Sequence, residues 1–308
     1  MTDPRRLGDR APLGSAPARP GREGVLQGGS TVRRLEATDS RGLAAGDLIR
    51  CLWGMVLRDL RVLSRNFAPF VTRTVMNPLL FVFVFTYVFP RIGQSFQSGP
   101  VGVSYATIVV PGLVAVGMVF TGISAVALPL SLELGGTHEI EDRVLAPVPV
   151  QMVAVEKLLV GAVQGVIGGL VVFPLVYLVP ATPVSVHVAS WPLLIAVVLL
   201  ASLTSGALGL ALGTIVRPQH IGLMFAVVVV PITFLGCVYY PWALLHPIPW
   251  LRALVLINPL VYMSEGLRAA LTPELPHMSP PAFLAALAVA TLILGGIGVR
   301  AFVRRTVS

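Results

Sequence analysis

The sequence has little charge and few residues suited to redox or metal chemistry. Charged residues make up 12% of the 308 residues, about half the share usual in soluble domains, whereas 55% are hydrophobic and the mean hydropathy is +0.84. The two cysteines, Cys51 and Cys237, lie in unrelated contexts, and no CxxC or HExxH spacing occurs. This balance excludes an ordinary soluble domain and a disordered protein, and it indicates a chain whose apolar surface faces lipid.

Motifs for nucleotide binding and for hydrolysis are also absent. The sequence contains no GxxxxGK[ST] phosphate loop and no GxSxG nucleophile elbow. Proton- and sodium-driven carriers usually place ionisable groups in mid-membrane, but the interiors of the second to sixth apolar runs lack Asp, Glu, Lys and Arg. We therefore expect no catalytic site, metal or bound cofactor in this chain, and the energy for uphill transport has to come from a partner.

Long apolar runs predict an all-α integral membrane protein with six transmembrane helices. Each run is close to the ~20 residues that a helix needs to cross the hydrocarbon core. Residues 1–45, rich in Arg, Gly, Pro and Ser and without a signal-peptide core, are predicted to be a disordered cytoplasmic arm. Residues 68–305 form the predicted six-span domain, with spans at about 71–89, 105–128, 153–179, 191–215, 221–240 and 282–302.

Residues 46–67, just before the first span, have the pattern of an amphipathic helix. Apolar residues recur at helical spacing, and arginines occupy much of the remaining surface. A basic amphipathic helix of this kind lies in the membrane interface, with its arginines near anionic head groups. The candidate interfacial residues are Arg50, Arg58, Arg61 and Arg65.

The distribution of basic residues predicts the topology. Of the 22 basic residues 21 are arginines, and the only lysine is Lys157. With six spans, 19 of them fall on the side of the two termini and three fall on the other side, namely Arg91, Arg252 and Arg268. The positive-inside rule therefore predicts a multi-pass protein of the inner (plasma) membrane with both termini in the cytoplasm. The same distribution explains the net charge of +8 without a nucleic-acid partner.

The loop 131–151 between the second and third spans is acidic and ends in prolines. We interpret it as a short polar helix that docks against a soluble partner, and a simple solvated loop is the alternative. Glu156 and Lys157, at the start of the third span, are interpreted as interfacial anchors. The candidate docking residues are Glu133, Thr137, Glu139, Glu141, Asp142, Arg143 and Pro147.

The segment 241–270, on the outer side, is apolar and aromatic but interrupted by prolines. It predicts a re-entrant hairpin after the fifth span, provided that protein covers its free backbone groups. Glu265 and Arg268 are three residues apart and can pair on one helical face. A structural ion pair is the first interpretation, and a gate or substrate contact is the alternative. The hairpin candidates are Asn258, Pro259, Tyr262, Glu265 and Arg268.

Proline, glycine and aromatic residues suggest further features of the spans. Pro111 and Gly112 predict a kink in the second span that lets helices approach closely. A stripe at helical spacing on the first span, Phe81, Phe85 and Phe89, is interpreted as packing or lipid-facing. An outer aromatic belt is predicted from Trp191, Trp242, Trp250, Tyr239 and Tyr240.

Taken in this order, the motifs resemble the membrane subunits of ABC-2 type transporters, over about residues 46–305. The resemblance rests on the amphipathic helix, on Tyr-Ala-Thr-Ile-Val-Val-Pro-Gly at 105–112, and on the acidic, proline-ended segment 133–149. It continues with Pro231 followed by Gly-Cys-Val-Tyr-Tyr-Pro at 236–241. It ends with Asn-Pro-Leu-Val-Tyr at 258–262 followed by Glu265 and Arg268. Val261 stands where the family often has threonine.

The resemblance implies a permease that works as a dimer, identical or mixed, with two separate nucleotide-binding ATPase subunits. ATP and Mg would be bound by those partners, and the helix 46–67 and the segment 133–149 would contact them. The sparse aliphatic spans favour a hydrophobic drug-like molecule or a lipid as substrate, exported from the cytoplasm. A polysaccharide or glycolipid exporter, a stand-alone channel or carrier, and an assembly protein without transport activity are the alternatives.

Overall fold

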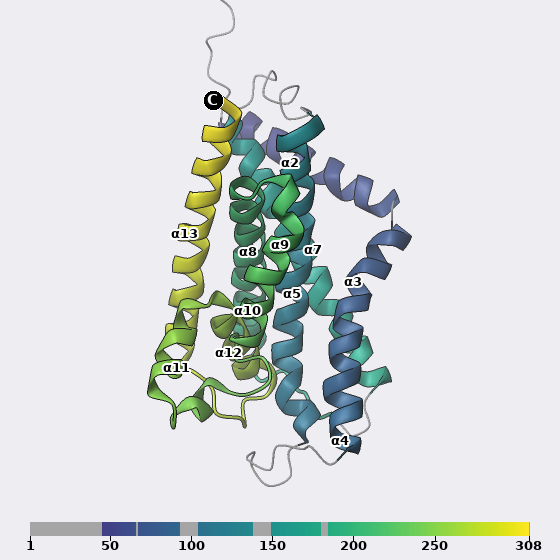
Figure 1. Cartoon of the computed structure of the whole chain (residues 1–308), viewed down its shortest axis with the longest axis vertical. Helices are drawn as coiled ribbons and strands as arrows, with labels where there is room; N and C mark the ends of the chain where they lie inside the picture. Colours follow the sequence, from purple (N-terminus) through teal and green to yellow (C-terminus); the bar gives the residue numbers. More distant parts are fainter. Residues whose placement is uncertain (1–44, 66, 93–103, 138–148, 180–183, 308) are drawn as a thin grey trace, which may run out of the picture. The chain divides into compact units, whose positions relative to one another are not determined.

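The computed structural model describes residues 45–65, 67–92, 104–137, 149–179 and 184–307, which contain helices and no strand (Figure 1). The chain divides into Met1–Asp47, of which only the start of one helix is described, and Leu48–Ser308, which holds everything discussed below. Nearly all of the predicted arm 1–45 lies outside the described residues. So does the segment 138–148, with Glu139, Glu141, Asp142, Arg143 and Pro147.

Seven helices of more than ten residues make up most of the described chain: α2 (Ala45–Arg65), α3 (Phe67–Val82), α5 (Tyr105–Leu132), α7 (Val150–Leu178), α8 (Trp191–Ile215), α12 (Pro259–Leu271) and α13 (Pro280–Val307). Short helical pieces extend or join them: η1 (Phe83–Val88), α4 (Phe89–Arg91), η2 (Glu133–Thr137), η3 (Pro218–His220), α9 (Ile221–Met224), η4 (Phe225–Val229), α10 (Val230–Phe234), η5 (Trp242–Leu245), α11 (Pro249–Leu254) and η6 (Val255–Ile257).

Five of the resulting helices are long and apolar enough to cross a membrane, namely Phe70–Arg91, Tyr105–Gly135, Val150–Leu178, Trp191–Ile215 and Pro280–Thr306. They correspond to the predicted spans one, two, three, four and six. The predicted fifth span is a shorter apolar helix, Pro218–Phe234, which ends before the expected boundary. A bent pair, Pro249–Ile257 and Pro259–Leu271, turns by 97° and brings the count to six only if it is taken as one span.

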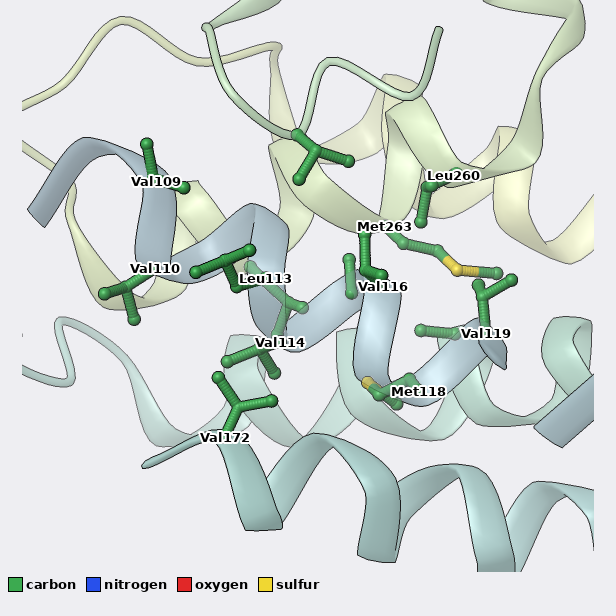
Figure 2. Packing of buried hydrophobic residues seen from close by; sticks show 14 of the residues in the cluster. Val109, Val110, Leu113, Val114, Val116, Met118, Val119, Val172, Leu260 and Met263 are labelled. Atoms are coloured by element: carbon green, nitrogen blue, oxygen red, sulfur yellow. The ribbon is translucent and has the colours of Figure 1, made fainter. Parts of the chain in front are cut away.

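Helix α5 is the centre of the packing. It contacts α3, α7, α8 and α12, and in Figure 1 it lies between α3 and α8. Within its most apolar stretch 78% of the residues are buried, against 22% for α13. Figure 2 shows Val114 next to Val172 of α7, while Val116 faces Leu260 and Met263 of α12. A helix that is apolar on every side can be covered by protein or by lipid, and α5 is covered mainly by protein.

Three glycines on α5 let three different neighbours come close. A Cβ atom at Gly117 would lie 2.8 Å from the carbonyl oxygen of Gly168 on α7. A Cβ atom at Gly122 would lie 2.7 Å from the Cβ atom of Ser205 on α8, and one at Gly112 would lie 2.1 Å from the backbone oxygen of Val238. Small residues allow this close approach, which supplies the dispersion contacts that hold membrane helices together.

Two wide helical turns precede prolines. The π-helical segments η1 and η4 end two residues before Pro90 and Pro231, respectively. Proline has no N–H and its ring clashes with the carbonyl group four residues earlier. Widening the preceding turn relieves this clash. In the first of these turns the buried Thr86 hydroxyl donates to the Val82 carbonyl at 2.7 Å, which gives this hydroxyl a hydrogen-bond partner.

The interface between α7 and α8 generates a stability prediction. A Cβ atom at Gly206 would lie 2.2 Å from the Leu158 carbonyl oxygen and 3.0 Å from the Ala162 nitrogen. Gly206→Ala must therefore separate two backbones, and we expect a loss of about 1–3 kcal/mol, seen as a lower melting temperature of the detergent-purified chain. Gly296→Ala on α13 is the matched control because nothing lies within 4 Å of its Cβ position. Equal melting temperatures for the two variants would contradict this packing.

Candidate functional site

Three charged side chains from three elements meet near the start of α7. We call Asp59 of α2, Glu133 of η2 and Lys157 of α7 the basal charge cluster. The Nζ atom of Lys157 lies 3.1 Å from Asp59 Oδ2 and 3.5 Å from Glu133 Oε1. The side chain of Lys157 is 9% exposed, and those of the two acids are 17% and 15% exposed. One ammonium group therefore joins two carboxylates that are far apart in the sequence.

Asp59 is held in its charged form by this arrangement. Burial alone would raise its pKa, but the charge of Lys157 and hydrogen bonds to Arg58, Glu156 and Lys157 lower the pKa to about 2. The Arg58 guanidinium donates to Asp59 Oδ1 at 2.9 Å from the exposed side of α2. The carboxylate consequently remains ionised at every pH that a cell experiences.

The basal charge cluster differs from the interpretation of the sequence in two residues. Lys157 was expected to be an interfacial anchor, but it is buried within the chain and paired. Asp59 was not singled out. The sequence held a signal for Lys157 but not for Asp59, because Lys157 is the one lysine in a chain with 21 arginines and an ammonium group is a compact point charge that two carboxylates can share.

The other residues predicted for docking and for the amphipathic helix lie on η2, on α2 or outside the described residues. Glu133 opens η2, and Thr137 is the last residue of η2. The remaining five docking candidates lie outside the described residues. The four arginines predicted for the amphipathic helix, Arg50, Arg58, Arg61 and Arg65, are all on α2 and all exposed.

A second charged group is fully buried in the segment after α10. We call Glu265 and Arg268 of α12, with their partners, the hairpin charge cluster. Both side chains have an exposure of 0%, and the Arg268 Nη1 atom donates to Glu265 Oε1. Glu265 also accepts hydrogen bonds from the backbone nitrogens of Trp242 and Met278, each at 2.9 Å. The three-residue spacing predicted this pair, and its partners tie both flanking segments to α12.

Arg268 holds a turn with an unusual backbone. Its Nη2 atom donates to the carbonyl oxygen of Cys237 at 3.2 Å, and Cys237 has a φ of +50°, in the left-handed region that non-glycine residues rarely adopt. The neighbouring carbonyl of Gly236 accepts from the Ser264 hydroxyl at 2.8 Å. The next residue, Val238, lies against Gly112 of α5. Two side chains of α12 thus fix the turn that contacts the central helix.

The remaining hairpin candidates have structural partners as well. Asn258 caps α12 by accepting from the Leu260 nitrogen at 3.0 Å, and its amide donates to the Ile232 carbonyl of α10 at 2.7 Å. Pro259 occupies the first position of α12, where its missing N–H has no consequence. The Tyr262 hydroxyl donates to the Leu256 carbonyl at 2.7 Å. These residues therefore set the 97° bend between the two helices.

Helix α5 continues through Pro111 and Gly112. The close approach at Gly112 is to the backbone of the turn at Val238 and not to another helix. Tyr239 does not belong to an exposed aromatic belt, because it is 8% exposed and its ring stacks on Phe85 at a centroid distance of 4.2 Å. Trp191 and Trp250, in contrast, are 66% and 70% exposed. Among the described residues, no group of three or more metal-ligating side chains occurs.

This architecture defines an all-helical, multi-pass membrane protein whose polar interior groups brace helices and turns. The family model for ABC-2 type transporters matches residues 50–272. The chain is similar to the inner membrane transport permease YadH of Escherichia coli strain K12, with 28% identity over 199 residues, covering 64% of this chain and 74% of that protein. The YadH permease of Shigella flexneri matches to the same extent. The chain belongs to the ABC-2 type transporter family.

The hairpin charge cluster generates a double-mutant prediction. Glu265→Gln leaves the Arg268 charge buried without its partner, and Arg268→Met leaves Glu265 in the same state. We expect each single change to cost about 3–5 kcal/mol and the double change to cost less than the sum. Thermal unfolding of the four proteins in one detergent measures this coupling. Additive losses would mean that the pair does not act as a unit.

The basal charge cluster generates a pH prediction. The pKa of Asp59, about 2, is below the ordinary value of 3.8, so the carboxylate stabilises the fold above about pH 4 and this contribution is lost as the pH falls toward 2. Asp59→Asn lacks the contribution at every pH. The melting-temperature difference between wild type and this variant should stay constant from pH 7 to 5 and shrink below pH 4. A difference that does not change with pH would contradict the assignment.

Proposed function

We propose that this chain is the membrane permease subunit of an ATP-driven exporter in the inner membrane, powered by a separate nucleotide-binding ATPase. Family membership supports a transport role, and the lack of a phosphate loop in the sequence supports an ATPase on another chain. We further propose that the permease pairs with a second permease and that both termini are cytoplasmic. The substrate in this proposal is a hydrophobic small molecule or a lipid.

The observation that carries this proposal is the basal charge cluster. The segment 138–148 follows η2 directly, so an ATPase that displaces this segment pulls on Glu133. Lys157 connects Glu133 to α7 and, through Asp59, to α2. The end of α5, the start of α7 and α2 would then respond together to one docking partner. A rigid connection of this kind is what a membrane subunit without its own energy source needs.

The surface of α2 supports a position in the membrane interface. Ile49, Trp53 and Leu57 recur every four residues and are 66%, 61% and 48% exposed. Arginines occupy other positions of the same helix. An apolar stripe beside a basic surface is typical of a helix that lies at the boundary between acyl chains and anionic head groups. In this proposal α2 transmits motion along the membrane surface.

The segment after α10 supports a re-entrant hairpin at the outer boundary. Its two arms are too short to span separately and meet at 97°. Three of its backbone groups, the carbonyls of Gly236 and Cys237 and the nitrogen of Trp242, have partners on α12, as covered backbone within a membrane requires. The aliphatic character of α5, whose buried side chains are mostly Val, Leu, Ile, Ala and Gly, supports a hydrophobic substrate.

The proposal predicts that Lys157 is needed for coupling. The experiment copurifies the permease with its soluble partner, reconstitutes the complex in nanodiscs, and compares ATP hydrolysis with that of the soluble partner alone. Lys157→Gln should reduce the permease-dependent change in ATP hydrolysis at least fivefold, because it disconnects both carboxylates. Lys157→Arg, which keeps the charge, should retain more of it. Arg300→Gln, at an exposed site on α13, is the control.

Two results would contradict the proposal. Purification of the chain alone, under conditions that preserve known complexes, together with flux in liposomes without ATP, would indicate a stand-alone channel or carrier. Wild-type coupling in both Lys157→Gln and a variant with Glu139, Glu141 and Asp142 neutralised would remove the docking segment from the mechanism. Membrane insertion and copurification of the soluble partner must be measured first for each variant.

A further inference from the structure

A hollow in the bent segment between α10 and α12 has features of a ligand site. Its volume is about 410 Å³, within the ~300–1,000 Å³ typical of small-molecule sites. It is widely open at the surface and mixes aromatic, basic and apolar side chains. Its lining residues are Trp242, His246, Pro249, Arg252, Ala253 and Leu256.

Arg252 is the charged residue of this hollow, and its guanidinium group is held in place by the chain. The Cζ atom of Arg252 lies 4.1 Å from the centroid of the Trp242 ring. The indole N–H of the same tryptophan donates to the Arg252 carbonyl oxygen at 3.2 Å. Stacking of this kind orients the planar donor group without consuming its hydrogen bonds. Arg252 is therefore pre-oriented for an acceptor that is not part of the chain.

No acid neutralises Arg252 within the part of the chain that the structure describes. The Nε atom of Arg252 is buried without a hydrogen-bond partner there, and the described salt bridges involve other residues. Glu265 accepts from the Trp242 backbone nitrogen, but its charge is paired with Arg268. A guanidinium group with free donors, an aromatic wall and a neighbouring imidazole at His246 suits a phosphate or carboxylate group.

The surroundings of the hollow indicate what carries this anionic group. Exposed apolar side chains cluster on the same segment, with Trp250, Leu254 and Ile257 at 70%, 47% and 82% exposure. A phosphate ion alone would fill only part of the volume. An amphiphile with an anionic head and an apolar body would meet the guanidinium group and the apolar surface together.

We propose that this hollow binds the head group of an anionic phospholipid, with the phosphate at Arg252 and the acyl chains along Trp250, Leu254 and Ile257. The inference goes beyond the proposed export activity and relies on it only for the position of the hairpin at the membrane boundary. Bound lipid would anchor the hairpin from the lipid side, opposite the hairpin charge cluster that anchors it to α12.

The test measures lipid binding to the purified full chain by native mass spectrometry, without the ATPase, so its result is independent of the coupling experiment. Dioleoyl phosphatidylglycerol is compared with dioleoyl phosphatidylcholine. Wild type should prefer the anionic lipid, and Arg252→Gln should weaken its binding about tenfold, the loss expected for charge-assisted hydrogen bonds. Arg91→Gln is a matched control, because Arg91 also stacks on an aromatic ring, that of Tyr87 at 4.6 Å, but does not line the hollow. It should change binding less than twofold.

A second variant covers the case in which Arg252→Gln does not fold. Ala253→Trp keeps the charge but fills the hollow from an exposed position on α11, and it should weaken binding of the anionic lipid to a similar degree. Equal effects of Arg252→Gln and Arg91→Gln, unchanged binding in Ala253→Trp, or no preference of wild type for the anionic lipid would each overturn the proposal. Release of the lipid by millimolar inorganic phosphate would identify a site for a free anion and would also overturn it.

Discussion

A buried backbone that leaves a helix loses water as a hydrogen-bond partner, and the structure after α10, where residues 236–239 are buried, depends on meeting this constraint. The chain does so with side chains of one helix. Glu265 accepts from two backbone nitrogens, and Arg268 and Ser264 donate to the carbonyls of Cys237 and Gly236. Because the carboxylate and the guanidinium group also neutralise each other, two charges can be buried completely. Removing either charge would leave the other buried without a partner, at a high cost in free energy. The hairpin is therefore held together as a single unit.

Helix α5 connects this unit to the other end of the molecule. The turn fixed by Arg268 lies against Gly112 near the start of α5, and Glu133 follows its last residue. Between these two points the helix is buried and packed against glycines of its neighbours. A closely packed helix moves as a rigid body more readily than it deforms. In the proposed transport mechanism, a displacement at Glu133 would therefore reach the hairpin without a separate signalling element.

The long helices could be predicted from the sequence because the length of an apolar run and its helical periodicity are local properties. Spans two and four begin at Tyr105 and Trp191 as expected, and the spacing of Glu265 and Arg268 was sufficient to predict their pairing. It could not find the role of Asp59, because its partner Lys157 is distant in sequence. Nor could it see that Tyr239 turns inward onto Phe85. Both outcomes depend on which helices pack together. The spanning helices α5, α7, α8 and α13 are apolar on every side, so their sequences do not indicate which face meets which neighbour.

The three arginines assigned to the outer side illustrate the same limit in electrostatic terms. A topology rule counts them equally, yet their surroundings differ. Arg268 is buried and neutralised by Glu265, Arg91 is exposed on the Tyr87 ring, and Arg252 lies on the Trp242 ring beside a hollow. The charge of Arg268 is neutralised within the fold, and the charge of Arg91 is screened by solvent. Among these three, Arg252 combines a partly desolvated charge with space for a ligand, and the proposed lipid binding rests on these surroundings and not on its charge alone.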